Sequence, residues 1–286
     1  MRPSPGRYRL LVTDIDGTLV AENQGVPPGV VEAVRRVQAR GVRVCVATGR
    51  MWDAARPFVE ALGADPPAIL YNGALVYDFA TGRKVWIGRL PRDHARRVLE
   101  VLRDFPWVSP LLFVHGQVHA ERMTPGVQRF ARRDGLTVRV VPRFAELLTE
   151  DPVKILIVGE PEDLALVSQA LQSLPGIPVN QVFSQADYLE ILPPDISKGR
   201  ALPVLAEHLG VSLGETVAVG DNLNDLTMLQ AAGLGVAVEG SPPELLAAAR
   251  WVCPRPEREG LRVLIERVFI GDVTRKERPS PGSGVR

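Results

Sequence analysis

The feature that constrains this chain most is how its first apolar run ends. The run RLLV at residues 9–12 leads directly into VTDIDGT, so Asp14 and Asp16 follow a segment typical of a buried parallel strand. Two like charges this close repel each other unless a cation or a reaction employs them. In an open α/β sheet, ligands gather beyond the carboxyl ends of the strands. The pattern favours a functional site at a strand end over the alternative of a solvated loop.

Strand-like and helix-like segments alternate on both sides of the sequence. Apolar runs predict strands at 42–48, 68–77, 215–220 and 234–238. Apolar residues at helical spacing predict helices at 29–41, 51–62, 197–210, 224–233, 243–250 and 258–270. Strict alternation of this kind predicts an α/β fold with a doubly wound, Rossmann-like parallel sheet.

The middle of the chain differs from both ends. It carries its own helical segments and a β-hairpin pattern, LLFVHGQVHA, around His115 and Gly116. We therefore expect an inserted α+β domain at 84–185, within a discontinuous core domain formed by 1–83 and 186–274. The segment 275–286, rich in charge, proline and glycine, is expected to be a disordered tail.

Composition excludes several function classes. The chain is 45% hydrophobic and 23% charged with a formal net charge of +1, so no electrostatic argument supports binding to nucleic acid or to an anionic membrane. No segment approaches about 18 uninterrupted apolar residues, and we expect no membrane span. Cys45 and Cys253 form no CxxC pair. A reducing, cytoplasmic location is the expectation that fits.

Three further segments place polar groups at strand or helix ends. Thr48 and Gly49 end a predicted strand directly before a helix, where a hydroxyl and free amides can bind phosphate or simply cap the helix. Lys198 lies at a helix start, where a cation opposes the helix dipole unless an anion offsets it. Asp221 and Asp225 follow another strand, and either can be a helix cap. Capping alone does not account for the whole set.

The motifs DIDGT, TGR, ISKG and GDNLND, in this order, resemble those of the haloacid dehalogenase-like superfamily of phosphohydrolases. The long segment between the second and third motifs, with YNGALVYD before it and YLEILPPDISKG after it, resembles the Cof-type subfamily, which has an α/β cap at this place. The resemblance implies that the inserted domain is a mobile cap over the site.

The resemblance also implies roles for the acidic residues. Asp14 would be the nucleophile that forms an aspartyl-phosphate, and Asp16 the general acid and base. Mg²⁺ would be the cofactor, held by the side chains of Asp14 and Asp221 and the main-chain carbonyl of Asp16. Asp225 would hold a metal-bound water or orient Lys198.

The phosphoryl oxygens would be bound by Thr48, Gly49, Lys198 and Asn224. Arg50 and Asn72 each follow a motif strand and are candidates for contact with substrate or cap, with a structural hydrogen bond as an equal alternative.

These residues predict a Mg²⁺-dependent phosphatase acting on small phosphorylated metabolites, with sugar phosphates as first candidates. Two alternatives stay open. A phosphomutase shares the aspartyl-phosphate but returns the phosphoryl group to a sugar, and a non-catalytic binding protein would keep only the fold. Release of inorganic phosphate from a monophosphate distinguishes the first two.

Overall fold

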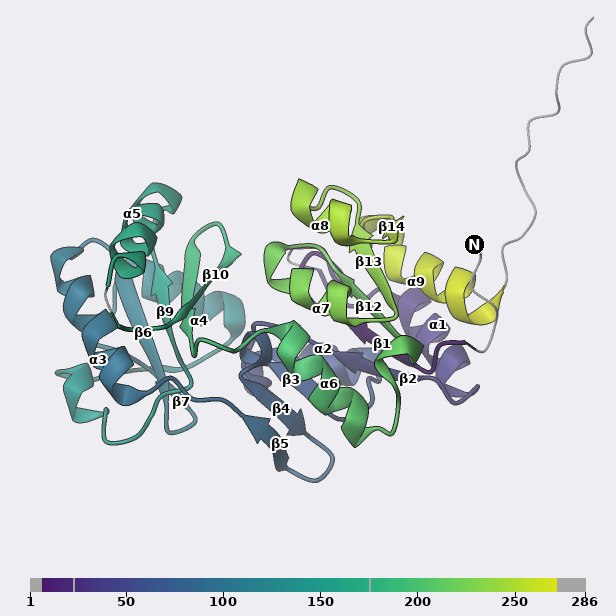
Figure 1. The fold of residues 1–286 in the computed structure, drawn as a ribbon, viewed down its shortest axis with the longest axis horizontal. Coiled ribbons are helices and arrows are strands. Elements are labelled where there is room, and N and C mark those ends of the chain that lie inside the picture. Colours follow the sequence, from purple (N-terminus) through teal and green to yellow (C-terminus); the bar gives the residue numbers. More distant parts are fainter. Residues whose placement is uncertain (1–6, 23, 175, 272–286) are drawn as a thin grey trace, which may run out of the picture.

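The computed structural model describes residues 7–22, 24–174 and 176–271, and shows two lobes joined by two connections (Figure 1). The predicted tail at 275–286 lies outside the described residues. In the part of the chain that the structure describes, no helix is long and apolar enough to span a membrane. The described Cys45 and Cys253 are buried and free.

The core lobe is built on a parallel sheet with strand order β14-β13-β12-β1-β2. Its strands are β1 (Leu10–Thr13), β2 (Arg43–Val46), β12 (Thr216–Gly220), β13 (Leu234–Val238) and β14 (Trp251–Cys253). The chain moves from β1 towards β2 and later returns on the other side of β1, so strand order reverses between β1 and β12. Ligand sites in doubly wound sheets form at this reversal. The predicted fold class is confirmed.

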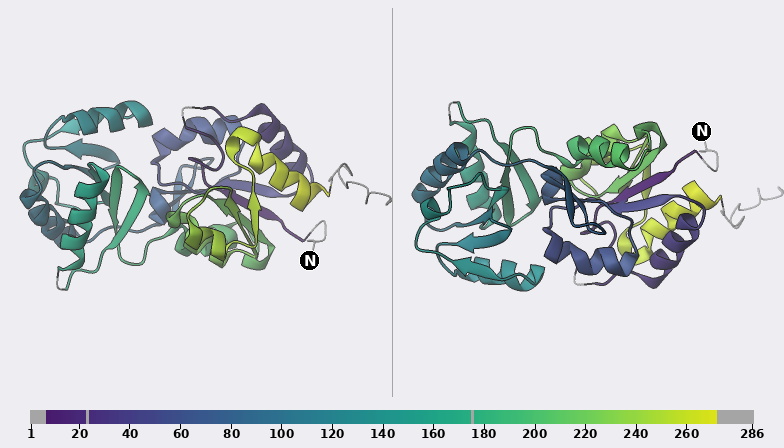
Figure 2. Two further views of the ribbon diagram at one scale, coloured as in Figure 1. Left: turned by 90° about the horizontal axis from the view of Figure 1, so that it is seen from above. Right: turned by 90° about the horizontal axis from the view of Figure 1, so that it is seen from below.

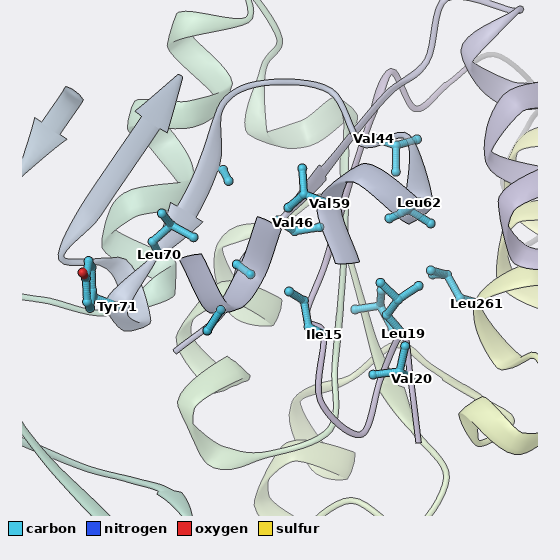
Figure 3. Packing of buried hydrophobic residues seen from close by; sticks show 14 of the residues in the cluster. Ile15, Leu19, Val20, Val44, Val46, Val59, Leu62, Leu70, Tyr71 and Leu261 are labelled. Carbon is cyan, nitrogen blue, oxygen red and sulfur yellow. The ribbon is translucent and has the colours of Figure 1, made fainter. Parts of the chain in front are cut away.

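Helices cover both faces of the core sheet (Figure 2). One face is covered by α1 (Pro28–Gln38), α2 (Trp52–Leu62) and α9 (Gly260–Ile265), and the other by α6 (Lys198–His208), α7 (Leu226–Ala231) and α8 (Pro243–Ala248). On the first face, Ile15 and Leu19 from the loop after β1 pack beside Val59 and Leu62 of α2 (Figure 3). Both loop residues are almost fully buried, so apolar packing anchors the loop that carries the first two aspartates.

The predicted strand at 68–77 is wrong in one respect, because it is two strands of a hairpin. The strands β3 (Ala68–Leu70), β4 (Leu75–Asp78) and β5 (Arg83–Ile87) form a small antiparallel sheet. A tight turn separates β3 from β4, with Asn72 at φ 53° and Gly73 at φ 102°. Such left-handed backbone cannot continue a strand. A parallel bridge from Ala47 to Ile69 attaches this sheet to the core.

The cap lobe contains a sheet with strand order β10-β11-β9-β6-β7-β8. Its strands are β6 (Ser109–Val114), β7 (Gln117–Ala120), β8 (Val138–Val140), β9 (Lys154–Val158), β10 (Asn180–Gln185) and β11 (Tyr188–Leu192). Helices α3 (Arg92–Val101) and α5 (Pro161–Gln172) pack on its outer face, and α4 (Pro125–Asp134) packs on the face towards the core.

Each of the two predicted domain boundaries would separate strands that pair with each other. A boundary after 83 falls within β5, which pairs with β4 of the core lobe. A boundary after 185 separates β10 from β11, which form one antiparallel hairpin of the cap sheet. We therefore propose that the cap runs from about residue 88 to about residue 192.

Candidate active site

Lys198 lies at the centre of the predicted site and has no exposed surface. Its Nζ is 2.9 Å from Asp14 Oδ1 and 2.6 Å from Asp225 Oδ1. The other oxygen of Asp225 accepts hydrogen bonds from the backbone N–H groups of Asp221 and Asn222, at 3.0 and 3.2 Å. Asp225 is therefore fully engaged within the protein, and of its two predicted roles the geometry fits the orientation of Lys198.

The loops after β1 and β12 contact each other directly. Thr18 Oγ1 donates a 2.7 Å hydrogen bond to Asp221 Oδ1. This approach depends on Gly17, because a Cβ there would lie 2.3 Å from Asp221 Oδ2, and its φ of 76° also favours glycine. The Thr18 hydroxyl of the DIDGT motif thus holds the loop after β1 to the loop after β12.

The carboxylates at this point form a set that suits a hard divalent cation. Oxygen atoms of Asp14, Asp221 and Asp225 lie within 4.8 Å of one another. Burial raises the pKa of Asp14 well above its ordinary value, and burial together with the charge of Asp225 raises the pKa of Asp221 to about 7. A divalent cation would relieve this crowding, since Mg²⁺ prefers carboxylate oxygens. Because both oxygens of Asp225 already accept hydrogen bonds within the protein, the side chains of Asp14 and Asp221 are the ones that fit a metal.

Asp16 lies apart from this cluster. Both of its carboxylate oxygens accept hydrogen bonds from Arg50, at 2.7 Å from Nη2 and 2.8 Å from Nε. The third guanidinium nitrogen, Nη1, is 3.4 Å from Asp134 Oδ1 in the cap. Arg50 also lies over the Phe58 ring, 4.9 Å from its centroid. Arg50 therefore joins the carboxylate predicted as general acid to the cap.

Thr48 and Gly49 lie in a loop that the hairpin turn holds in place. Asn72 N donates to Thr48 O at 3.0 Å, and Arg50 N donates to Thr48 Oγ1 at 3.1 Å. Helix α2 has Met51 as its N-cap, so the capping alternative for Thr48 is wrong. Within the described residues, the Thr48 hydroxyl accepts this hydrogen bond from Arg50 and donates none, so its proton can be donated to a ligand.

Asn72 and Asn224 meet behind this loop. Asn224 Nδ2 donates to Asn72 Oδ1 at 2.9 Å, and Asn72 Nδ2 is buried without a partner among the described residues. A Cβ on Gly49 would lie 2.9 Å from that unpaired nitrogen. A buried donor beside the loop is one that a bound anion can satisfy.

The cap closes over these groups and leaves a cavity of about 70 Å³. Its lining includes Asp14, Asp16, Thr48, Gly49, Arg50, Asp221 and Asn224 from the core and Phe113, Phe130, Arg133, Asp134, Lys154, Tyr188 and Glu190 from the cap. Ligand pockets commonly enclose about 300 Å³ or more. The cap must therefore open or shift before a metabolite can enter.

Lys154 and Glu190 form an ion pair on the inner face of the cap, 2.7 Å apart with both side chains 4% exposed. Lys154 Nζ also donates to Gly49 O at 3.2 Å and lies 4.8 Å from the centroid of the Phe113 ring. The sequence prediction gave none of these cap residues a role. One signal pointed to Lys154: the chain has lysine only at 84, 154, 198 and 276.

The chain matches the model of the haloacid dehalogenase-like hydrolase family over residues 11–265. It belongs to that family. The HMP-PP phosphatase of Serratia proteamaculans is 30% identical over 83% of this chain and 86% of its own length. The pyridoxal phosphate phosphatase YbhA of Escherichia coli is 29% identical over 85% of this chain and 92% of its own length.

A solved structure of a haloacid dehalogenase-like hydrolase from Bacteroides thetaiotaomicron superposes with a TM-score of 0.82. It is 29% identical and covers 92% of this chain and 100% of its own. The protein is therefore a phosphatase of the haloacid dehalogenase-like family, of the Cof type with a cap domain. The predicted family, fold and enzyme class are confirmed.

The structure brings the predicted residues of this phosphatase to one edge of the core sheet. Lys198 and Asp225 lie beside Asp14, while Asn72 lies behind the loop of Thr48 and Gly49. The alternative prediction that Asp225 caps a helix holds in part, because Asp225 forms a capping box with Asn222. Asp225 bonds Lys198 with its other oxygen, so it serves both purposes.

Proposed function

We propose that this protein is a Mg²⁺-dependent phosphatase that hydrolyses small phosphorylated metabolites through an aspartyl-phosphate on Asp14. One observation carries the proposal: the Asp14 carboxylate lies 2.9 Å from buried Lys198 and within 4.8 Å of the Asp221 carboxylate, at the reversal point of the sheet. Two carboxylates and a buried cation at this point suit phosphoryl transfer, in which catalysis is largely positioning and charge stabilisation.

The side chains of Asp14 and Asp221 and the main-chain carbonyl of Asp16 would hold Mg²⁺. When bound, it would neutralise charge between the nucleophile and the phosphoryl oxygens. Lys198 holds one oxygen of Asp14 and leaves the other to attack phosphorus.

Thr48, the Gly49 amide, Lys198 and Asn224 would bind the phosphoryl oxygens. Asn72 supports Asn224 from behind and offers its unpaired Nδ2 towards the same loop. Fixed donors of this kind typically contribute about 2.7–4 kcal/mol each to transition-state stabilisation.

Asp16 would donate its proton to the departing oxygen of the ester and then take a proton from the water that cleaves the aspartyl-phosphate. Its carboxylate lies outside the cluster of Asp14, Asp221 and Asp225 and faces Arg50 instead. Arg50 would orient it.

Two observations support the proposed substrate class: the size of the closed cavity and the names of two relatives. A cavity that closes to about 70 Å³ suits a small ester rather than a macromolecule. The relatives are named for HMP-PP and for pyridoxal phosphate, both small phosphorylated metabolites. Sugar phosphates remain the first candidates, followed by phosphorylated cofactors.

The test is phosphate release from p-nitrophenyl phosphate and from a panel of phosphorylated metabolites, with and without Mg²⁺. The wild type should release inorganic phosphate only with the metal, and Asp14→Asn should lose roughly 10³-fold or more in kcat. Asp104→Asn, at an exposed cap position, is the matched control and should behave as the wild type. An Asp14→Asn variant of near wild-type rate would exclude this nucleophile. Transfer to a second hydroxyl without phosphate release would favour the phosphomutase.

A further inference from the structure

Arg50 is shared between the core and the cap in a way that the reaction above does not explain. It holds both oxygens of Asp16 and also approaches Asp134, the last residue of α4. The side chains of Arg50 and Asp134 are 13% and 11% exposed, whereas Asp16 is 40% exposed. The guanidinium group is thus mostly withdrawn from water between two carboxylates.

Asp134 stands where stability alone would not place an acidic residue. The carboxyl end of a helix carries a partial negative charge, so an aspartate there is disfavoured. Burial adds to this and raises the pKa of Asp134, against the lowering effect of Arg50 and Arg133. Arg133 lies 3.6 Å from it but is also drawn towards Tyr188, over whose ring it stacks at 4.1 Å. Placements that oppose local preference are expected at functional sites.

The bidentate pair also conflicts with the role of Asp16. A carboxyl group that donates a proton to the leaving oxygen needs one oxygen atom free of the guanidinium group. In the observed arrangement both oxygens accept from Arg50. Arg50 must therefore release at least one of them during the reaction. When Arg50 releases one oxygen, the buried N–H group that donated to that oxygen needs another acceptor.

We infer that Asp134 is a positioning residue from the cap that draws Arg50 away from Asp16 once a substrate is bound beneath the closed cap, freeing Asp16 to protonate the leaving group. This inference rests on the proposed function. Arg50 stays charged throughout and exchanges one hydrogen-bond acceptor for another. Nη1 already donates a 3.4 Å hydrogen bond to Asp134 Oδ1, so a small movement of the guanidinium group would bring Nη2 from Asp16 to the same carboxylate.

The exchange can be tested by comparing two aryl phosphates whose leaving groups differ in their need for a proton. p-Nitrophenolate departs with little need for a proton, whereas phenolate needs the general acid. In Asp134→Asn, which keeps the shape but loses the charge, kcat/KM for phenyl phosphate should fall roughly tenfold or more relative to that for p-nitrophenyl phosphate. Asp134→Glu, which keeps the carboxylate, should restore the ratio towards the wild-type value. Asp104→Asn is again the control.

An Asp134→Asn ratio equal to that of the wild type would overturn the inference, whether or not both rates fall together. If Asp134→Asn does not yield folded protein by its thermal unfolding curve, Asp134→Ser gives the same comparison. A wild type that releases no phosphate from either ester would instead contradict the proposed function. The two failures are therefore distinguishable.

Discussion

Lys198 carries a positive charge at a position with no access to solvent. Burial alone would lower its pKa, but the charges of Asp14 and Asp225 outweigh burial and raise the pKa above its ordinary value. The sequence identified this lysine because a cation at a helix start opposes the dipole. It did not identify Asp134 or Glu190, whose meaning depends on which way a helix end and a strand face after folding. A functional residue can be predicted when its local sequence context is unusual, as for Lys198. A residue that tertiary packing brings to the site, such as Asp134 or Glu190, cannot be predicted in this way.

The carboxylate of Asp221 should make the stability of the metal-free protein depend on pH. The pKa of Asp221 is about 7 when folded and about 3.9 when unfolded, so the folded state binds the extra proton. That contribution to stability is fully present below about pH 4 and is lost as the pH rises through about 7. Mg²⁺ bound at the proposed site would replace the proton, so it should raise Tm more at about pH 8 than at about pH 5.

Thermal unfolding with EDTA and with saturating Mg²⁺ measures this difference. Asp221→Asn should remove most of the Mg²⁺ effect on Tm at the higher pH. An equal Tm increase in the wild type and in Asp221→Asn would exclude Asp221 as a metal ligand.

At the scale of elements, the hairpin turn between β3 and β4 packs against the start of α6. A Cβ on Gly73 would lie 2.2 Å from the carbonyl oxygen of Ser197, the N-cap of the helix that begins with Lys198. The sequence predicted the strands and helices of the core from their periodicity, but continued one strand through this turn. The turn depends on left-handed backbone at Asn72 and Gly73, which apolar periodicity does not report.

Gly73→Ala should therefore lower both stability and activity. Its φ of 102° and the clash with Ser197 should cost at least about 1–3 kcal/mol in the free energy of unfolding and displace Lys198. Gly82→Ala, at φ 72° with open space around it, is the matched control and should show only the smaller backbone cost. Urea unfolding and kcat measure the two effects. Equal losses in both variants would mean that the contact with Ser197 has no role.

At the scale of the whole molecule, the cap lies against the core through polar contacts around the site. Lys154 bonds the Gly49 carbonyl, Asp134 approaches Arg50, and Asn222 Nδ2 donates to the Ser184 carbonyl at 3.4 Å. The sequence predicted an inserted cap from motif spacing and from the change of pattern in the middle of the chain. Which cap side chains would reach the loop of Thr48 and Gly49 could not be predicted, because this depends on how one lobe sits on the other.

The buried pair of Lys154 and Glu190 should affect both stability and closure. Lys154→Met leaves the Glu190 charge buried alone and should lower the free energy of unfolding by about 3–5 kcal/mol. The double variant Lys154→Met/Glu190→Gln should recover much of this stability but still lack the contact with Gly49, so its KM should stay raised. Arg96→Met breaks an exposed pair and should cost less than about 1 kcal/mol. A double variant with wild-type KM would show that Lys154 does not serve closure.

In the proposed mechanism the Asp14 carboxylate itself receives the phosphoryl group, and the decisive experiment is chemical trapping of that intermediate. The Mg²⁺-loaded enzyme is quenched with acid during turnover and reduced with borohydride, which converts an aspartyl-phosphate to homoserine, and the peptides are then read by mass spectrometry. We predict homoserine at position 14 and unmodified aspartate at positions 16, 221 and 225. Homoserine at one of those other positions, or at none while phosphate is being released, would exclude Asp14 as the nucleophile.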